Sequence, residues 1–89
     1  MKTIKIFVTG SVQGVYFRKF VSKTAGELKL KGFVRNLNDG RVEIVVEGRD
    51  ERVNEMVEAC KKGAPQASIK EVQTQELSNQ GFDSFKILK

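Results

Sequence analysis

The sequence of 89 residues contains no histidine. Histidine is the side chain that most often acts as a general base near neutral pH, and it is the commonest zinc ligand. Its absence excludes the Ser-His and Cys-His pairs that activate a nucleophile. The carboxylates of Asp39, Glu43 and Glu47 fit a turn and the solvent face of a strand, without the spacing of an acid–base pair or a metal site. We therefore expect no metal and no cofactor.

The sequence also has only one cysteine, one proline and no long hydrophobic run. Cys60 alone cannot form an internal disulfide, which fits a reducing compartment, and its place on an apolar helical stripe predicts a buried, inert thiol. No apolar run approaches the ~18 residues of a membrane span, and residues 1–10 alternate like a strand rather than a signal peptide. We expect one globular domain over residues 1–89, in the cytoplasm and not bound to a membrane.

Positive charge is in modest excess, with 16 Lys and Arg against 11 Asp and Glu and a formal net charge of +5. A basic chain can bind nucleic acid. Here the lysines alternate with acidic residues and form no long block, which favours the interpretation that they cover solvent-facing positions. A mildly positive protein also attracts small phosphorylated metabolites, so the sign of the charge does not choose between these partners.

Apolar residues alternate in residues 3–9 and recur at spacings of three and four along two later segments. These patterns are typical of half-buried strands and amphipathic helices. The predicted elements are a strand at 3–9, a helix at 16–30 ended by Gly32, strands at 33–37 and 41–47 around a turn at 38–40, a helix with Asp50 as N-cap that ends at 61–65, and strands at 69–77 and 82–88. This β-α-β-β-α-β order predicts an α+β, ferredoxin-like α/β sandwich, an antiparallel sheet with two helices on one face.

Residues 8–20, with the sequence VTGSVQGVYFRKF, lead from a strand through a short loop into a helix. The first N–H groups of a helix have no partner within it, and glycine accepts the positive φ that lets neighbouring N–H groups converge. Gly10 and Gly14 lie in this loop, and Arg18 follows in the first helical turn. A phosphate-sized anion is therefore a candidate ligand. The loop lacks the Walker A and G-x-G-x-x-G patterns, so nucleotide binding is not favoured.

Arg18 and Asn36 each allow a structural and a functional interpretation. An arginine in the first helical turn is often only solvated, and there it opposes the helix dipole at a cost of about 0.3–1 kcal/mol. A bound anion would replace this repulsion with attraction. Asn36 stands in a strand where β-branched or aromatic residues are usual, either at an edge near the hairpin or as an amide that aligns a water. Spacing alone leaves both alternatives open for both residues.

Two segments resemble the acylphosphatase family. Residues 9–18, TGSVQGVYFR, are similar to its G-x-V-Q-G-V-x-[FY]-R pattern, and residues 32–43, GFVRNLNDGRVE, are similar to its G-x-V-x-N-x-x-D-G-x-V-E pattern. Residues 82–88 also resemble the last strand of the family. The likeness covers essentially the whole chain, and we expect a small stand-alone member rather than a domain of a larger maturation factor.

The resemblance implies metal-independent hydrolysis of a carboxyl–phosphate mixed anhydride to carboxylate and phosphate. It implies that Arg18 binds the phosphoryl oxygens and that Asn36 positions the attacking water. Phosphoryl transfer asks chiefly for positioning and charge stabilisation, so a chain without histidine can catalyse it. We also expect a monomer that acts on small molecules. The phosphate-binding loop that the resemblance implies consists of Ser11, Val12, Gln13, Gly14, Val15, Tyr16, Phe17 and Arg18.

A binding domain is one alternative, because RNA-recognition domains share the β-α-β-β-α-β order. Residues 31–33, KGF, begin like the RNP1 pattern, but Val34, Arg35 and Asn36 stand where that pattern continues toward its stacking aromatics. RNA is therefore not favoured as a partner. A protein that has the fold but no catalytic activity is the other alternative, and it is favoured over an RNA-binding domain.

Overall fold

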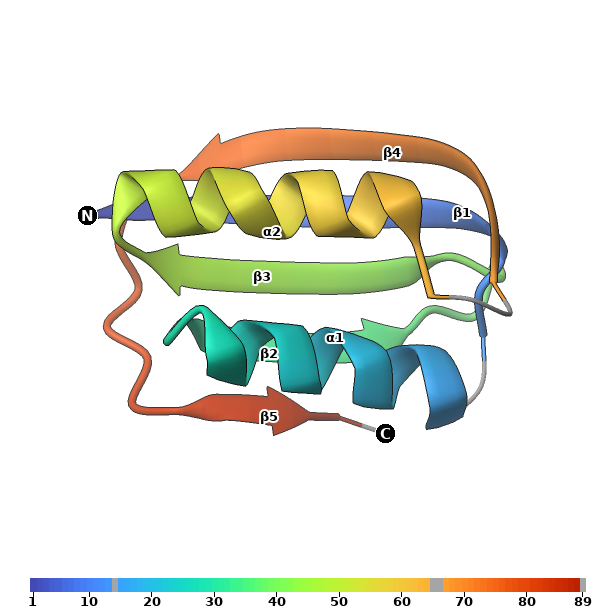
Figure 1. The fold of residues 1–89 in the computed structure, drawn as a ribbon, viewed down its shortest axis with the longest axis horizontal. Coiled ribbons are helices and arrows are strands. Elements are labelled where there is room, and N and C mark those ends of the chain that lie inside the picture. The colour runs from blue at the N-terminus through green and yellow to red at the C-terminus, as the bar shows by residue number, and fades with distance from the viewer. Residues whose placement is uncertain (14, 65–66, 89) are drawn as a thin grey trace.

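The structure is a computed structural model that describes residues 1–13, 15–64 and 67–88. The strands form one sheet in the order β4-β1-β3-β2-β5, and both helices cover the same face of it (Figure 1). The predicted α+β, ferredoxin-like sandwich is confirmed. Its elements, in chain order, are β1 (Lys2–Ser11), α1 (Val15–Glu27), β2 (Lys31–Asn36), β3 (Val42–Gly48), α2 (Asp50–Lys62), β4 (Ser68–Leu77) and β5 (Phe85–Ile87).

The sheet is mixed rather than wholly antiparallel. The pairs among β1 to β4 are antiparallel, but β5 lies parallel to β2. Leu77 of β4, Thr3 of β1, Glu47 of β3 and Lys31 of β2 lie in register at one end of the sheet. Residues 78–84 cross that end from β4 to the opposite edge (Figure 1). As a result β5 starts beside the start of β2 and runs in the same direction.

The hydrophobic core lies between the sheet and the two helices. The predicted alternation of β1 is confirmed, because Ile4, Ile6 and Val8 are buried and paired with buried β3 residues. Cys60 belongs to this core, and burial raises the pKa of its thiol to about 12, as expected for an inert cysteine. The helices contribute their apolar stripes, which comprise Phe17, Val21 and Ala25 of α1 and Val53, Met56 and Cys60 of α2.

Both helices differ at one end from the prediction. α1 stops at Glu27 rather than near residue 30, and Lys29 turns the chain with a φ of 57°. Gly32 lies inside β2, where a Cβ would stand only 1.8 Å from the Val45 carbonyl oxygen, so its role is a close backbone approach. The predicted N-cap Asp50 is wrong, because Arg49 occupies that position without a side-chain capping bond. Asp50 is instead the first helical residue, where its negative charge interacts favourably with the positive end of the helix dipole.

Two acidic residues that were predicted to face solvent are buried. Glu43 and Glu47 lie in β3, on the sheet face away from the helices, and each is only 5% exposed. Glu43 forms ion pairs with Arg35 of β2 and Lys5 of β1, at 2.5 and 3.8 Å. The alternation in β3 was therefore predicted correctly, but its second face is covered by neighbouring side chains and by the crossing segment at residues 78–84.

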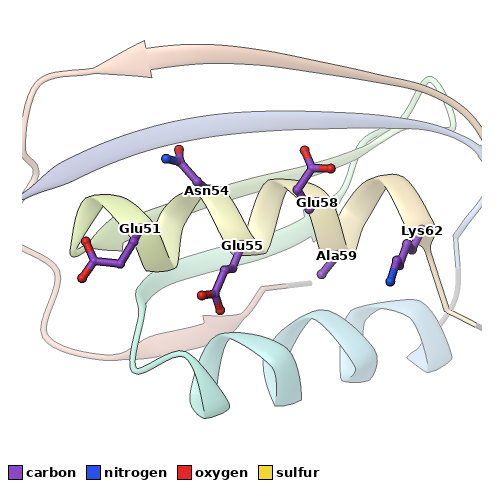
Figure 2. A pocket seen from close by; sticks show the side chains of 6 residues that line it. All are labelled: Glu51, Asn54, Glu55, Glu58, Ala59 and Lys62. Atoms are coloured by element: carbon purple, nitrogen blue, oxygen red, sulfur yellow. The ribbon is translucent and has the colours of Figure 1, made fainter.

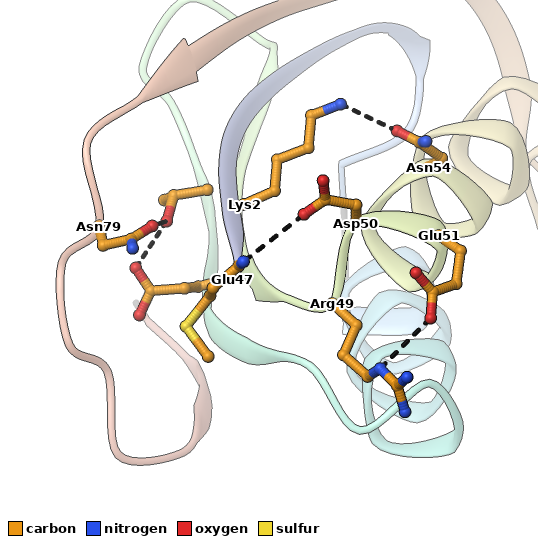
Figure 3. Close-up of polar contacts among 9 residues, drawn as sticks. Lys2, Glu47, Arg49, Asp50, Glu51, Asn54 and Asn79 are labelled. Atoms are coloured by element: carbon orange, nitrogen blue, oxygen red, sulfur yellow. Dashed lines mark hydrogen bonds and ion pairs between the residues drawn. The ribbon is translucent and has the colours of Figure 1, made fainter.

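Glu47 anchors the segment that crosses the end of the sheet. One carboxylate oxygen accepts a hydrogen bond of 2.6 Å from the Thr3 hydroxyl and another from the Gln80 N–H. The second oxygen accepts bonds of 3.0 and 3.2 Å from the N–H groups of Gly81 and Phe82. The side chains at this end are shown in Figure 3. The hydrogen bond from Thr3, followed by those from the backbone, outweighs burial and lowers the pKa of Glu47.

Glu47→Gln is expected to lower the free energy of unfolding by about 2–3 kcal/mol at pH 7, because an amide cannot accept all of these bonds. A lowered folded-state pKa stabilises the wild type above the unfolded-state value of about 4.5, and this contribution is lost as the pH falls through the folded-state value. The difference between the proteins should therefore shrink below pH 4.5. Urea denaturation from pH 7 to pH 3 measures it. Exposed Glu55→Gln is the control, and equal stabilities of E47Q and wild type at pH 7 would contradict the anchor.

Candidate active site

The loop between β1 and α1 carries the predicted phosphate-binding residues. Gly10 has a φ of 141°, and a Cβ there would lie 2.0 Å from the Ser68 carbonyl oxygen, at a register shift between β1 and β4. Gly10 therefore allows β4 to approach β1 closely. This approach alone explains the glycine, without the predicted role in shaping the loop for an anion. Gly14 lies outside the described residues.

The other loop residues take different positions relative to the core. Ser11 ends β1 and pairs with Ser68 of β4, and Val15 begins α1. Val12 and Phe17 are buried, at 2% and 3% exposure, so their side chains fix the loop to the core while their backbone atoms are part of the loop and helix start. The Gln13 and Tyr16 side chains are exposed.

The N-terminus of α1 has the charge pattern of an anion site. Its first turn contains no acidic residue and does contain Arg18. By contrast, α2 has Asp50 and Glu51 in its first turn and basic residues in its last, which complements its own dipole. The free N–H groups at the start of α1 thus meet a positive side chain and no negative one. A bound anion would neutralise both.

Arg18 is half-buried and is held by the residue that follows β5. Its Nη1 donates a hydrogen bond of 3.0 Å to the carbonyl oxygen of Leu88. Leu88 in turn donates its N–H to the carbonyl oxygen of Val34 in β2, at 2.8 Å. The Nε of Arg18 is buried and has no hydrogen-bond partner within the described part of the chain. A buried donor without a partner is costly, and in native structures such a group calls for an explanation, of which a bound ion, a water and a catalytic role are the usual ones.

Asn36 is the last residue of β2 and is paired with Val42 of β3. Its side chain is half-buried, and its Oδ1 is buried without a hydrogen-bond partner among the residues that the structure describes. Asn36 lies beyond the part of β2 that pairs with β5, so the alternative of an edge position near the hairpin fits the register, while the burial of Oδ1 fits the functional alternative. Among the described residues, two buried side-chain atoms have no hydrogen-bond partner, Arg18 Nε and Asn36 Oδ1. They belong to the two residues that the sequence selected for catalysis.

The structure brings the start of α1 and the end of β2 to the same end of the molecule (Figure 1). Arg18 reaches Val34 of β2 through Leu88, as described above. On the other side, Gln13 donates from its side-chain Nε2 to the carbonyl oxygens of Leu37 and Arg41, at 2.7 and 3.1 Å. Sequence reasoning missed both connections. The Leu88 contact uses a backbone carbonyl, which leaves no signal in the residue type.

A separate hollow lies on the outer face of α2 (Figure 2). Three carboxylates line it, and they would repel an anionic substrate. Its residues come from α2 alone, and none is from the loop before α1 or from β2. This hollow is therefore not the phosphate site. Its lining residues are Glu51, Asn54, Glu55, Glu58, Ala59 and Lys62.

The Acylphosphatase family model matches residues 4–87 of the chain. An acylphosphatase of Methylococcus capsulatus is 41% identical over 90 residues, which cover 100% of this chain and 98% of the relative. The crystal structure of acylphosphatase from Bacillus subtilis superposes with a TM-score of 0.95 at 41% identity, with complete coverage of both chains. HypF of T. kodakarensis is 48% identical with a TM-score of 0.82, and the match covers 100% of this chain but 12% of HypF.

The fold and the charge pattern at the start of α1 define a class of protein: an α+β sandwich with a site that suits a phosphoryl anion. With the family model and these relatives, the chain belongs to the acylphosphatase family. The family function is the hydrolysis of acyl phosphates, so the chain is a hydrolase that acts on acid anhydrides and takes small acyl phosphates as substrates. This confirms the function predicted from the two motifs. No described helix has both the length and the apolar character needed to cross a membrane.

Proposed function

We propose that Arg18 and the backbone N–H groups from Ser11 to Arg18 hold the phosphoryl group of the acyl phosphate, and that Asn36 positions the attacking water. The observation that carries the proposal is the pair of unpartnered buried atoms, Arg18 Nε and Asn36 Oδ1. One is a charged donor suited to phosphoryl oxygens, and the other is an acceptor suited to a water O–H. A phosphoryl group and a water together supply the partners that both atoms lack.

The bonds that change in this reaction explain why two side chains are enough. The water oxygen attacks phosphorus, the bond from phosphorus to the acyl oxygen breaks, and the carboxylate leaves with the electron pair. The proton of the water passes to an oxygen of the phosphate product. A carboxylate is a good leaving group, so the protein needs to place the reactants and stabilise the charge on the phosphoryl oxygens. Arginine and helix N–H groups supply that charge stabilisation.

Asn36 suits water placement because of its fixed backbone. It ends β2, where pairing with Val42 sets the direction of the side chain. The Oδ1 can accept one water hydrogen and leave a lone pair of the water oxygen directed toward phosphorus. No proton needs to be removed before attack, which suits a chain without histidine. The role is that of an orienting group rather than a base.

Turnover of benzoyl phosphate tests the function directly. We expect release of benzoate and phosphate at an undiminished rate in the presence of a chelator, because the groups proposed for catalysis are all protein groups. Inorganic phosphate should inhibit competitively, since it is the product that the loop and Arg18 hold. Release of benzoate can be followed by its absorbance. A protein that shows no turnover, or that loses turnover with the chelator, would contradict the proposal.

The rest of the predicted biology belongs with this proposal. Action as a single domain over residues 1–89, a monomeric state and a cytoplasmic location stay predictions, and they are consistent with a small-molecule hydrolase. RNA is not proposed as a partner, because the positive charge of Arg18 at the start of α1 is explained by the proposed binding of a phosphoryl group. The excess of positive charge would then favour the approach of anionic metabolites.

A further inference from the structure

Gln13 connects the two halves of the site. Both hydrogens of its side-chain amide are used, one on the Leu37 carbonyl oxygen at 2.7 Å and one on the Arg41 carbonyl oxygen at 3.1 Å. These carbonyls flank the turn between β2 and β3, which is closed by the bond from the Leu37 N–H to the Arg41 oxygen at 2.8 Å. An exposed glutamine would normally be solvated and free to change rotamer. Here one exposed side chain is held at two points.

The two carbonyls lie directly beside Asn36. Leu37 follows Asn36 in the chain, and Arg41 precedes Val42, the β3 residue paired with Asn36. The Asn36 Oδ1 has no hydrogen bond to the described residues. No hydrogen bond to this oxygen from the described residues orients the amide, so its direction depends on the backbone of β2 and on the packing around it. A group that holds this backbone in place controls where the amide points.

The turn that Gln13 holds is itself rigid. Asp39 accepts hydrogen bonds from the backbone N–H and the Nε of Arg41, at 3.0 and 2.9 Å. The Arg41 guanidinium also lies over the ring of Phe7 in β1, 4.5 Å from its centre. If Gln13 moved, these contacts would make the turn between β2 and β3 move with it as one body. The loop before α1 and the backbone of Asn36 then keep a constant separation.

We propose that Gln13 is a positioning residue, whose side-chain amide sets the position of Asn36 relative to the phosphoryl group held at the start of α1. The proposal rests on the proposed function of Arg18 and Asn36, and it assigns Gln13 a role through its side chain in addition to its backbone. A displacement of about 1 Å of a catalytic group can reduce the rate of an enzyme about 100-fold. Gln13 thus acts on the rate of the chemical step rather than on affinity.

Gln13→Ala tests this role, with Gln80→Ala as the matched control. Gln80 also donates its side-chain Nε2 to a backbone carbonyl, that of Ser78 at 2.8 Å, but it lies in the segment that crosses the other end of the sheet. We expect kcat for benzoyl phosphate to fall about 10- to 100-fold in Q13A. The inhibition constant of inorganic phosphate should change less than about twofold, since charge contacts to the anion remain. Q80A should match the wild type in both.

A double-mutant cycle separates positioning from a merely structural contact. If Gln13 acts through Asn36, Q13A should lower kcat less than about twofold in an Asn36→Ala background. A full additional loss in that background, or a kcat in Q13A equal to that of the wild type, would overturn the proposal. A rise in the phosphate inhibition constant that parallels the loss of kcat would also overturn it, because Gln13 would then be part of the phosphate cradle.

A second measurement does not depend on turnover. Inorganic phosphate is titrated into ¹⁵N-labelled protein, and the side-chain amide signals of Asn36 are followed by NMR. We expect phosphate to shift these signals in the wild type and in Q80A, and to shift them less than half as far in saturated Q13A. An equal shift in Q13A would overturn the role of Gln13 even if the enzyme proved inactive. Wild-type protein without turnover would instead contradict the proposed function.

Discussion

Replacement of Arg18 by alanine is expected to lower kcat/KM for benzoyl phosphate by about 10³-fold, equivalent to about 4 kcal/mol of transition-state stabilisation. The guanidinium is the one charged side chain placed in the first turn of α1. Its Nη1 is held by the Leu88 carbonyl, which leaves the buried Nε and the remaining N–H donors for the phosphoryl oxygens. Steady-state hydrolysis of benzoyl phosphate measures the loss.

The conservative variant and a control make the Arg18 result specific. Arg18→Lys should also lose most activity, because an ammonium group cannot donate two bonds in a planar fork. Arg49→Ala, which removes an exposed arginine paired with Glu51 at 3.2 Å, should keep wild-type kinetics. Thermal denaturation should show R18A folded, since its side chain makes one hydrogen bond to the described residues and lies outside the core. Activity retained in a folded R18A protein would contradict the role of Arg18 in binding phosphate.

Asn36→Ala is expected to lower kcat by about 10²- to 10³-fold while the inhibition constant of inorganic phosphate changes little. The amide is proposed to act on the water, so its loss affects the chemical step and not the phosphate contacts. Stability should stay the same or increase, because the substitution removes a buried oxygen that has no hydrogen-bond partner among the described residues. Activity assays and urea denaturation of the same preparation test both parts.

An asparagine elsewhere on the surface provides the comparison. Asn54 of α2 is exposed and accepts a hydrogen bond from Lys2 at 3.2 Å. Asn54→Ala should leave both kcat and phosphate inhibition unchanged. The role of Asn36 would be wrong if N36A kept its kcat, or if its loss of activity came entirely from a weaker interaction with phosphate. A large loss of stability in N36A would show that the side chain supports the fold instead.

Local patterns were sufficient for most of the fold. The alternation in β1 and the helical spacing of Val53, Met56 and Cys60 predicted buried faces that the structure confirms. These patterns are reliable because a strand or helix turns its side chains with a fixed period. The helix ends were less certain. The positive φ of Lys29 and the place of Arg49 at the N-cap position both go against residue preference, so residue type did not predict them.

The candidate site was also largely predictable, but only as separate residues. The motifs around Arg18 and Asn36 identify the family, and the missing histidine points to chemistry by charge and positioning. No spacing rule showed that the start of α1 and the end of β2 lie at the same end of the sheet (Figure 1). That arrangement depends on the order of the strands, and with it came two contacts that the sequence did not indicate: Leu88 with Arg18, and Gln13 with the turn after Asn36.

The amino-acid sequence alone thus accounts for the order of the elements and the core faces, because each depends on residue type and short-range periodicity. The type of chemistry came from the resemblance of its two motifs to the acylphosphatase family. The tertiary structure decides the parallel placement of β5, the burial of Glu47 under the segment at residues 78–84, and the hydrogen bond of Arg18 to Leu88. These features join residues far apart in the chain, such as Arg18 and Leu88. Their relative positions depend on the segment at residues 78–84, which crosses the sheet and brings β5 beside β2.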